Sequence, residues 1–485
     1  MIWGGIKEGA KQAAVAFVTG KLLNRTSGAK MQSPKEVEKY ANARNKGLLL
    51  DGASRRLSET DSFQNVCVIA RVGAGKTSRY IIPNVIDRAR HNCSVVVNDP
   101  KGEVFEKTSG YMQAKGFKVI AINPEDLTQS SSFNPLWQAR DDQEIEQIAQ
   151  ILIRAGAGKN DGGNQFWNDS ATRLVSILLK LLNRAGQVNR DENTLGNLYR
   201  LLQNFGSNGS PLDEFAIKWA FDPAYPDDES LWDEWQGAVT GAENAIAGVV
   251  QTALTALQAF TNQNLVKLTA RSSINLEDLR RQKIALYFIT PPQLAEYYGF
   301  WTSLFFRSVF NAAMRRMPDR RTLPLYVLYD EFGHSTIPHF GSIANTIRGY
   351  KVSLSIILQS MAQLSTRYGK DYAQAIQGGL TTYMTYAGSD QETAKHFEAI
   401  AGKVVERNAM ATMQQHTEYN LLNADEVRRI EKSQAILLSS NQNPALLETL
   451  GYFENRQMRG VAKRYGQARI AGAAAQNRPV RVNIP

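Results

Sequence analysis

The sequence predicts an α/β fold in which a parallel-rich central sheet is interrupted by an all-helical domain. Three observations lead to this prediction. Short apolar runs alternate with helical stretches from residue 46, the strand signal stops near Asp141, and it returns at residue 283. Strands and helices in alternation indicate crossover units, because a parallel neighbour requires a helix to carry the chain back along the sheet. We therefore expect one nucleotide-binding domain that is split in the sequence by a second domain.

Three apolar runs predict the first strands of the sheet, with a helix between each pair. The runs are NVCVIA (65–70), CSVVVND (93–99) and FKVIAIN (117–123). The helical stretches between them are KTSRYIIPNVIDRARH (76–91) and GEVFEKTSGYMQAKG (102–116). The order strand, helix, strand is typical of a parallel sheet whose faces are covered by helices.

Residues 143–270 are rich in helical periodicity and poor in strand signal. In NAIAGVVQTALTALQAF (244–260) the apolar residues recur every three or four positions, which gives the segment one apolar face. FWNDSATRLVSILLKLLNR (166–184) predicts another helix, and the acidic, proline-containing FDPAYPDDES (221–230) predicts a loop between them. We interpret the block as an all-α insertion.

The strand signal returns after the insertion and predicts the rest of the sheet. The strand candidates are KIALYFIT (283–290), LPLYVLYDE (323–331), YKVSLSIILQS (350–360) and TTYMTYAG (381–388), and a long helix is expected at 291–316. The expected division of the chain is an N-terminal helical segment (1–30), the first part of the nucleotide-binding domain (31–140), the all-α domain (141–275), the second part of the nucleotide-binding domain (276–455) and a basic C-terminal tail (456–485).

Composition excludes some classes of protein and favours others. The 485 residues carry a formal net charge of +10, with a sequence pI of about 9.4, which favours a polyanionic partner such as DNA. Cys67 and Cys93 are the only cysteines and both lie in apolar runs, so we expect buried thiols and a reducing, cytoplasmic compartment. Two cysteines and five scattered histidines offer no structural zinc site.

The two ends of the chain differ in character from the body. No stretch reaches the roughly 18 to 20 apolar residues that a membrane-spanning helix needs. The first 25 residues are expected to pack against the body, with an amphipathic surface helix as the alternative. After Glu454 the chain has seven Arg or Lys and no acid. We expect the last fifteen or so residues to be solvated and partly disordered, with contact to nucleic acid or membrane as the alternative.

The stretch ARVGAGKT (70–77) carries most of a phosphate-binding loop. The pattern G-x-x-x-x-G-K-[ST] requires a strand before it and a helix after it, and both are predicted here. Ala70 stands where the pattern has its first glycine. Backbone N–H groups of such a loop bind phosphates, the lysine reaches the terminal phosphates, and the hydroxyl binds Mg²⁺. The nucleotide-binding candidates are Arg71, Val72, Gly73, Ala74, Gly75, Lys76, Thr77 and Ser78.

An acidic pair supports this interpretation. Asp330 and Glu331 end the apolar run LPLYVLYDE, at the carboxyl edge of a predicted parallel strand. An acid there lies beside the phosphate loop and can hold Mg²⁺, while the next carboxylate can polarise the attacking water. A pair of solvated acids opening a turn is the alternative, and it fits the long apolar run before them less well.

Four further residues are candidates from their places in the pattern. Gln359 ends the strand candidate VSLSIIL and could sense the γ-phosphate. Arg348 lies between the acidic strand and that strand, and could reach across a subunit boundary as an arginine finger. Asp99 and Lys101 follow the second strand in NDPKGE, where a role near the metal and a role in subunit contact both stay open.

With these segments assembled, the chain resembles the conjugative coupling proteins of type IV secretion, the VirD4/TraG family of the FtsK/HerA-like ring ATPases. The resemblance rests on GAK, KGLLLDG, ARVGAGKTSRYIIPN, SVVVNDPKGEVFEKTSGY, SSFNPL, FWNDSATRLV, INLEDLRRQKIALYFITPP, LYDEFGHSTIPHFGSIANTIRGYKVSLSIILQSMAQLSTRYG, GSDQETAKHFEAIAGK and LLNADEVRRIEKSQAILL. It implies a RecA-like P-loop domain, ATP and Mg²⁺ as cofactors, and a tolerated alanine at position 70.

The resemblance also implies roles for individual residues and partners. Lys76 and Thr77 would bind phosphate and Mg²⁺, Asp330 would be the metal-binding acid, and Glu331 the catalytic carboxylate. Gln359 would be the sensor and Arg348 a candidate finger. The expected assembly is a homo-hexameric ring that moves single- or double-stranded DNA, or protein substrates, recruits the relaxase or relaxosome and delivers to the channel of a type IV secretion system.

The chain departs from the family at its N-terminus, where members usually begin with membrane-spanning helices. A membrane-anchoring partner, a soluble lineage or a trimmed chain would each account for this. The expected location is the cytoplasm, at the cytoplasmic face of the inner membrane. Two alternatives stay open: a soluble FtsK/HerA-like DNA pump in chromosome handling, and a substrate-recruiting adaptor with minor ATPase activity.

Overall fold

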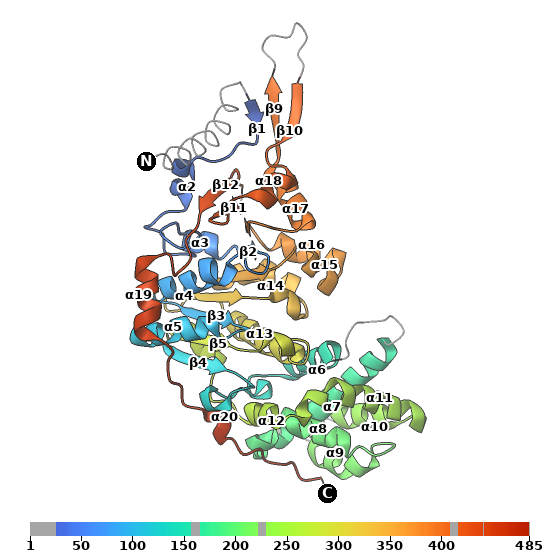
Figure 1. Ribbon diagram of the computed structural model, residues 1–485. Helices are drawn as coiled ribbons and strands as arrows, with labels where there is room; N and C mark the ends of the chain where they lie inside the picture. The colour runs from blue at the N-terminus through green and yellow to red at the C-terminus, as the bar shows by residue number, and fades with distance from the viewer. Residues whose placement is uncertain (1–25, 157–164, 222–228, 408–415, 440, 485) are drawn as a thin grey trace.

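The chain is built around one large sheet, with a helical domain at one end of the molecule and a small second sheet at the other (Figure 1). The computed structural model describes residues 26–156, 165–221, 229–407, 416–439 and 441–484. Among these residues, no helix is both long and apolar enough to cross a bilayer.

The central sheet has nine strands in the order β12-β11-β8-β2-β7-β6-β3-β5-β4. Every one of the seven predicted strand regions contains one strand, and these seven run parallel, which confirms the predicted α/β class. Two antiparallel strands at one edge, β11 and β12, were not predicted. In this order the strands are Ala445–Glu448, Gln434–Ser439, Thr382–Tyr386, Val66–Ile69, Val352–Leu358, Leu325–Tyr329, Ser94–Asn98, Ile284–Phe288 and Lys118–Ile122.

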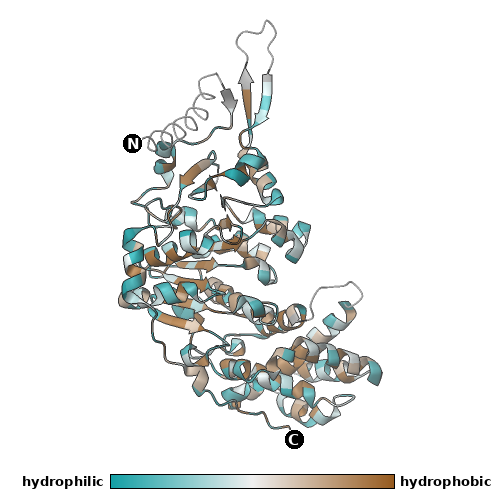
Figure 2. Ribbon diagram, in the orientation of Figure 1, coloured by the Kyte–Doolittle hydropathy of each residue, from teal (hydrophilic) through white to brown (hydrophobic). Residues whose placement is uncertain are grey.

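Both faces of the sheet are buried, which explains why its strands are continuous apolar runs. Val68 faces the core that α4 (Ile82–Arg88), α5 (Glu103–Ala114) and α19 (Arg456–Tyr465) cover, whereas Ile69 faces the opposite core. In Figure 2 the strands form a brown centre between helices whose outer sides are largely teal. The helices on the other side of the sheet are α13 (Gly299–Met314), α14 (Phe340–Thr346), α15 (Ala362–Tyr368), α16 (Lys370–Gly378) and α17 (Gln391–Ala401).

The chain between β4 and β5 contains helices and no strand among its described residues. The two predicted helices of this block correspond to α7 and α11. Its helices are α6 (Asp142–Gly156), α7 (Gln165–Val188), α8 (Leu195–Gln203), α9 (Asp213–Ala220), α10 (Ser230–Val239), α11 (Glu243–Ala256) and α12 (Gln263–Ala270). α6 packs against α13, so the block is joined to the second core of the sheet. Its exact boundaries as a domain stay a prediction.

A small antiparallel sheet of β1 (Thr26–Gly28), β9 (Lys403–Arg407) and β10 (His416–Asn420) lies at the far end from the helical domain (Figure 1). The expectation of a helical segment over residues 1–30 is wrong for Thr26–Gly28, because their backbone pairs with Val404, Val405 and Glu406 of β9. The rest of that expectation, up to residue 25, lies outside the described residues. Two short helices, α2 (Pro34–Tyr40) and α3 (Glu59–Ser62), lead into the central sheet.

The C-terminal segment docks onto the body through backbone hydrogen bonds, so the expectation of a partly disordered tail is wrong for the residues described, although many of residues 471–484 are solvent-exposed. α19 lies against α5, where the missing side chain of Gly110 lets the backbones meet and Gly110 N–H donates to Gly466 O at 3.2 Å. The chain then passes α20 (Ala473–Gln476) to reach the helical domain, where Val482 N–H donates to Asn197 Oδ1 at 3.1 Å. Small residues such as Gly110 permit this close packing, although the C-terminal segment is rich in arginine and lysine.

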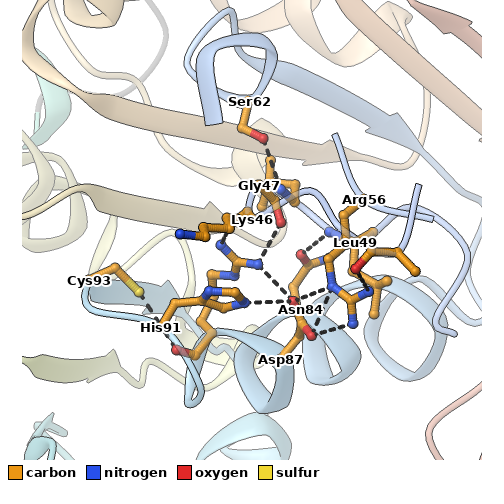
Figure 3. Close-up of polar contacts among 12 residues, drawn as sticks. Lys46, Gly47, Leu49, Arg56, Ser62, Asn84, Asp87, His91 and Cys93 are labelled. Atoms are coloured by element: carbon orange, nitrogen blue, oxygen red, sulfur yellow. Dashed lines mark hydrogen bonds and ion pairs between the residues drawn. The ribbon is translucent and has the colours of Figure 1, made fainter. Parts of the chain in front are cut away.

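A buried polar cluster holds the segment between α2 and β2 against α4 (Figure 3). The Arg88 side chain is fully buried, donates to the carbonyl oxygens of Lys46 and Gly47, and pairs with Asp87, which also binds Arg56. Burial would raise the pKa of the Asp87 carboxyl, but its contacts with His91, Arg56 and Arg88 outweigh burial and lower that pKa. A buried charge is tolerated only when it is paired in this way. The cluster therefore fixes the helix that follows the phosphate loop.

Candidate functional site

The phosphate loop runs from the end of β2 to η1, a single π-helical turn at Thr77–Ile81 that continues into α4. Gly73 and Gly75 have φ angles of 83° and 92°, a left-handed region that favours glycine. Arg79 N–H and the Ser78 hydroxyl both donate to Gly75 O, at 2.7 and 3.2 Å, and close the loop onto the turn. π-turns are rare and occur frequently at functional sites.

The backbone contacts of Ala70 explain why alanine can replace the first glycine of the phosphate-loop pattern. Its N–H donates to Leu358 O at 2.9 Å and continues the pairing of β2 with β7, and its methyl group is fully buried in the core. The left-handed freedom of glycine is used at positions 73 and 75, whereas position 70 is not among the residues with positive φ. A small side chain without a positive φ is sufficient there.

The predicted acidic pair lies opposite the loop. Asp330 directly follows β6, is 6% exposed, and places Oδ1 3.1 Å from Lys76 Nζ. Thr77 Oγ1 lies 3.4 Å from Asp330 Oδ2. A hydroxyl and a carboxylate side by side are hard oxygen donors, the ligand type that Mg²⁺ prefers. The donor set present therefore fits the magnesium ion that the sequence predicts.

Glu331 is held by three neighbours. Its Oε1 pairs with Lys76 Nζ, and its Oε2 accepts from Gln359 Nε2 at 2.7 Å and lies 3.3 Å from His334 Nε2. Burial would raise the pKa of the Glu331 carboxyl, but the contacts with His334, Lys76 and Gln359 outweigh it and lower that pKa to about 2. Burial raises the pKa of Asp330, and Lys76 opposes that shift. Glu331 is thus the acid of the pair that stays ionised most readily.

The backbone at Glu331 explains how His334 reaches it. Glu331 has a φ of 53°, an uncommon conformation for a residue with a side chain, and the short helix Phe332–His334 begins there. This turn brings His334 back to the Glu331 carboxylate three residues away. His334 was not predicted, because a left-handed glutamate leaves no signal in the sequence pattern.

Asn98, at the end of β3, is a second residue of the site that was not predicted. Its Nδ2 donates to the backbone oxygen of Asp330 at 2.6 Å and so fixes the position of the metal-binding candidate. A polar residue closing a buried strand next to β6 was the available signal. One cavity contains predicted and unpredicted residues of the site. The predicted residues that line it include Val72, Lys76, Thr77, Asp330, Glu331 and Gln359, and the unpredicted ones include His334, Thr290, Thr302 and Ser335.

Asp99 lines the same cavity and also contacts the backbone of α5. Its Oδ2 accepts from Phe105 N–H at 2.7 Å and satisfies the first turn of α5. Its side chain is almost fully buried, and this burial raises the pKa of the carboxyl to about 7. Lys101 is exposed and lines the cavity.

The raised pKa of Asp99 predicts a pH-dependent stability. The folded state binds the Asp99 proton more tightly than the unfolded chain, so this group's contribution is lost as the pH rises from about 4 to 7. Asp99→Asn removes the ionisation. At pH 8 we expect the variant to have a higher unfolding temperature than wild type and a free energy of unfolding about 2–4 kcal/mol larger. At pH 4 the two proteins should differ little.

Thermal unfolding without nucleotide, across this pH range, measures the effect. Asp371→Asn, an exposed acid on α16, is the control, since its stability should follow wild type at every pH. Parallel pH profiles for Asp99→Asn and wild type would contradict the assignment.

One predicted residue lies away from the others. Arg348 is exposed in the turn Ile347–Tyr350 before β7, whereas the phosphate loop and Gln359 lie at the opposite end of that strand. Arg348 therefore does not contribute to the site of its own chain. Arg71 and Val72 are exposed at the tip of the phosphate loop.

Comparisons with known proteins agree with this geometry. A sequence model of the family described as type IV secretory system conjugative DNA transfer matches residues 26–472. The chain is 25% identical over 415 residues to Protein VirD4 of Rhizobium rhizogenes and 24% identical over 417 residues to Protein VirD4 of Rhizobium radiobacter. These matches cover 81% and 82% of this chain and 59% and 58% of the relatives, so the chain spans about three fifths of their length.

Solved structures show the same fold. The bacterial conjugative coupling protein TrwBdeltaN70, in an unbound form, matches with a TM-score of 0.69 at 14% identity, over 88% of this chain and 93% of that chain. TrwB in complex with ADP and Mg²⁺ matches with a TM-score of 0.68 at 13% identity, over 88% and 94%. VirB4 of Thermoanaerobacter pseudethanolicus matches less well, at 0.52 and 13% identity over 84% and 96%. The likeness confirms the predicted RecA-like P-loop fold.

Proposed function

Because this chain belongs to the family of type IV secretory system conjugative DNA transfer proteins, we propose that it is an Mg²⁺-dependent ATPase that couples ATP hydrolysis to DNA movement. It acts as a coupling protein, which recruits a relaxase–DNA complex or a protein substrate and delivers it to a type IV secretion channel. The work is done by a homo-hexameric ring at the cytoplasmic face of the inner membrane.

One observation carries the ATPase proposal. Lys76 and Thr77 of the phosphate loop, Asp330 and Glu331 after β6, and Gln359 after β7 come from three segments far apart in the sequence. Their side chains meet at the carboxyl ends of the parallel strands of one sheet, where ligands of such sheets bind. A fold without a nucleotide function has no need for a lysine, two acids, a hydroxyl and an amide in one place.

The chain's own residues divide the work at this edge. The backbone N–H groups of the phosphate loop and Lys76 would bind the phosphates, and Thr77 and Asp330 would hold Mg²⁺. The metal, when bound, neutralises charge on the phosphates. Lys76 must leave its two carboxylates to reach a phosphate, which frees Glu331 Oε1. Gln359 then keeps Glu331 in place through Oε2.

Glu331 is the group that activates water in this proposal. With a pKa of about 2 it is ionised at neutral pH, so it can accept a hydrogen bond from a water molecule and orient it. The same low pKa makes it a weak base, and its main contribution is orientation and electrostatic stabilisation. Arg348 is exposed at the opposite edge of the sheet, and only a neighbouring subunit's site is available to it as an arginine finger.

The test of the motor function is ATP turnover with and without single-stranded DNA, with native mass measurement of the same sample. We expect turnover to rise when DNA is added and the protein to assemble into a hexamer. DNA binding should weaken steeply with salt, because phosphate contacts release counterions. The motor function would be contradicted if the protein binds relaxase but hydrolyses only traces of ATP, at a rate that DNA does not change. That result would favour a recruiting adaptor.

A further inference from the structure

A second cavity lies on the β8 side of the phosphate loop, next to the site already described. It is lined by Arg71, Gln359, Gly388, Ser389, Asp390, Arg428 and Arg429. Arg71 belongs to the phosphate loop, Ser389 follows β8, and the other two arginines end α18 (Ala424–Arg429). Gln359 lines both cavities, so the two spaces adjoin at the side chain that holds Glu331.

The charge of this cavity is strongly positive. Its one acid, Asp390, is already used as the N-cap of α17, where its carboxylate accepts from Glu392 N–H, Thr393 N–H and the Thr393 hydroxyl at 3.0, 3.1 and 2.6 Å. Arg428 contacts Gln391 and Asp425 at 3.3 and 3.8 Å. Within the described part of the chain, the guanidinium groups of Arg71 and Arg429 have neither an ion pair nor a hydrogen bond.

Ser389 points to a ligand independently of the arginines. Its side chain is 2% exposed, yet its hydroxyl has no hydrogen-bond partner among the described residues. A buried hydroxyl without a partner costs stability, so native proteins seldom keep one unless something else satisfies it. Gly388, with a φ of 79° and its N–H donating to Arg428 O at 3.0 Å, fixes the backbone beside this hydroxyl.

We propose that this arginine cavity binds a phosphate group. Guanidinium groups and a hydroxyl are the donors that bind phosphate oxygens best, and the three arginines outnumber the one carboxylate, whose oxygens accept hydrogen bonds from α17. Because Gln359 lines both cavities, the favoured source of this phosphate group is inorganic phosphate released from the adjoining site. This inference rests on the proposed ATPase function. A phosphodiester of bound single-stranded DNA offers the same chemistry and is the other source of such a group.

The test measures binding of inorganic phosphate by calorimetry to Lys76→Ala protein, in which the phosphate loop is disabled. Wild type saturated with ADP and Mg²⁺ serves as a second sample if that variant folds poorly. We expect phosphate binding to persist in both, and to weaken about tenfold or more when Arg429→Gln is added, because one charge-assisted hydrogen bond is lost. Arg459→Gln, an exposed arginine on α19, is the matched control and should leave the affinity unchanged.

Ser389→Ala separates a binding role from a structural one. Because the hydroxyl has no partner, its removal should leave the unfolding temperature in phosphate-free buffer unchanged or raise it. The same variant should bind phosphate several-fold more weakly. Unchanged phosphate affinity in both Ser389→Ala and Arg429→Gln, or no phosphate binding in either starting sample, would overturn the proposal. None of these measurements needs turnover, so they fail independently of the ATPase function.

A competition experiment assigns the source of the phosphate group. An oligonucleotide without terminal phosphates is added to the phosphate-bound Lys76→Ala protein. If the DNA displaces the phosphate, and Arg429→Gln weakens this displacement, the cavity binds a phosphodiester of the DNA strand. If the phosphate stays bound beside the DNA, the cavity binds the product of hydrolysis.

Discussion

Lys76→Ala is expected to abolish ATP hydrolysis, with turnover falling by about 10²–10³-fold or below detection. Among the residues that the structure describes, Lys76 is the one cation that contacts both Asp330 and Glu331, and it is the residue placed to reach the terminal phosphates. Its loss removes a phosphate ligand and leaves the two carboxylates to repel the incoming anion. Nucleotide affinity should therefore fall together with turnover, which a phosphate-release assay and a fluorescent-nucleotide titration measure.

The lysine variant needs a folding control, because it also leaves two buried carboxylates without their cation. Far-ultraviolet circular dichroism and thermal unfolding establish that the variant is folded. Lys107→Ala removes a surface lysine whose partner is the adjacent Glu106, and it should keep wild-type turnover. A folded Lys76→Ala protein with turnover within twofold of wild type would rule out the phosphate loop as the hydrolysis site.

Glu331→Gln is expected to stop hydrolysis while nucleotide binding is kept or strengthened. The amide has the shape of the carboxylate and can stay near Gln359 and His334, but it cannot polarise water as a carboxylate does. It also no longer pairs with Lys76, so the lysine is freer to bind phosphate. We expect turnover to fall by about 10²–10⁴-fold, with a nucleotide dissociation constant equal to or below that of wild type.

The contrast between the two variants is more informative than either loss alone. Lys76→Ala should lose binding and turnover together, whereas Glu331→Gln should lose turnover only. Glu106→Gln, an exposed acid on α5, is the matched control for the second variant. A Glu331→Gln protein that binds nucleotide tenfold more weakly than wild type would mean that Glu331 supports binding and is not the catalytic carboxylate.

The sheet was predictable because burial on both faces makes its strands continuous apolar runs. β10, HTEYN, carries no such run, since it lies in a small sheet outside the main core, and it was missed. The docked C-terminal segment was missed for a different reason. Its basic composition predicts solvation, whereas Ala474 and Val482 are buried and backbone groups bond to two domains. Composition does not record such backbone contacts.

The candidate site was predictable where residues end parallel strands. Lys76, Asp330 and Gln359 each follow a strand, and strand order then brings them together. His334 depends on the left-handed backbone of Glu331, and the arginine cavity depends on α18 returning beside β8. Both features are set by tertiary structure, so a pattern of residue types along the chain does not contain them.

The central claim, that this site drives movement along DNA, is tested most directly by displacement of streptavidin from a biotinylated single strand. Wild type with ATP and Mg²⁺ is expected to remove the block, and Glu331→Gln, with nucleotide bound, is expected to leave it in place. Equal displacement by wild type and Glu331→Gln, or none by wild type that hydrolyses ATP on the same DNA, would contradict the account.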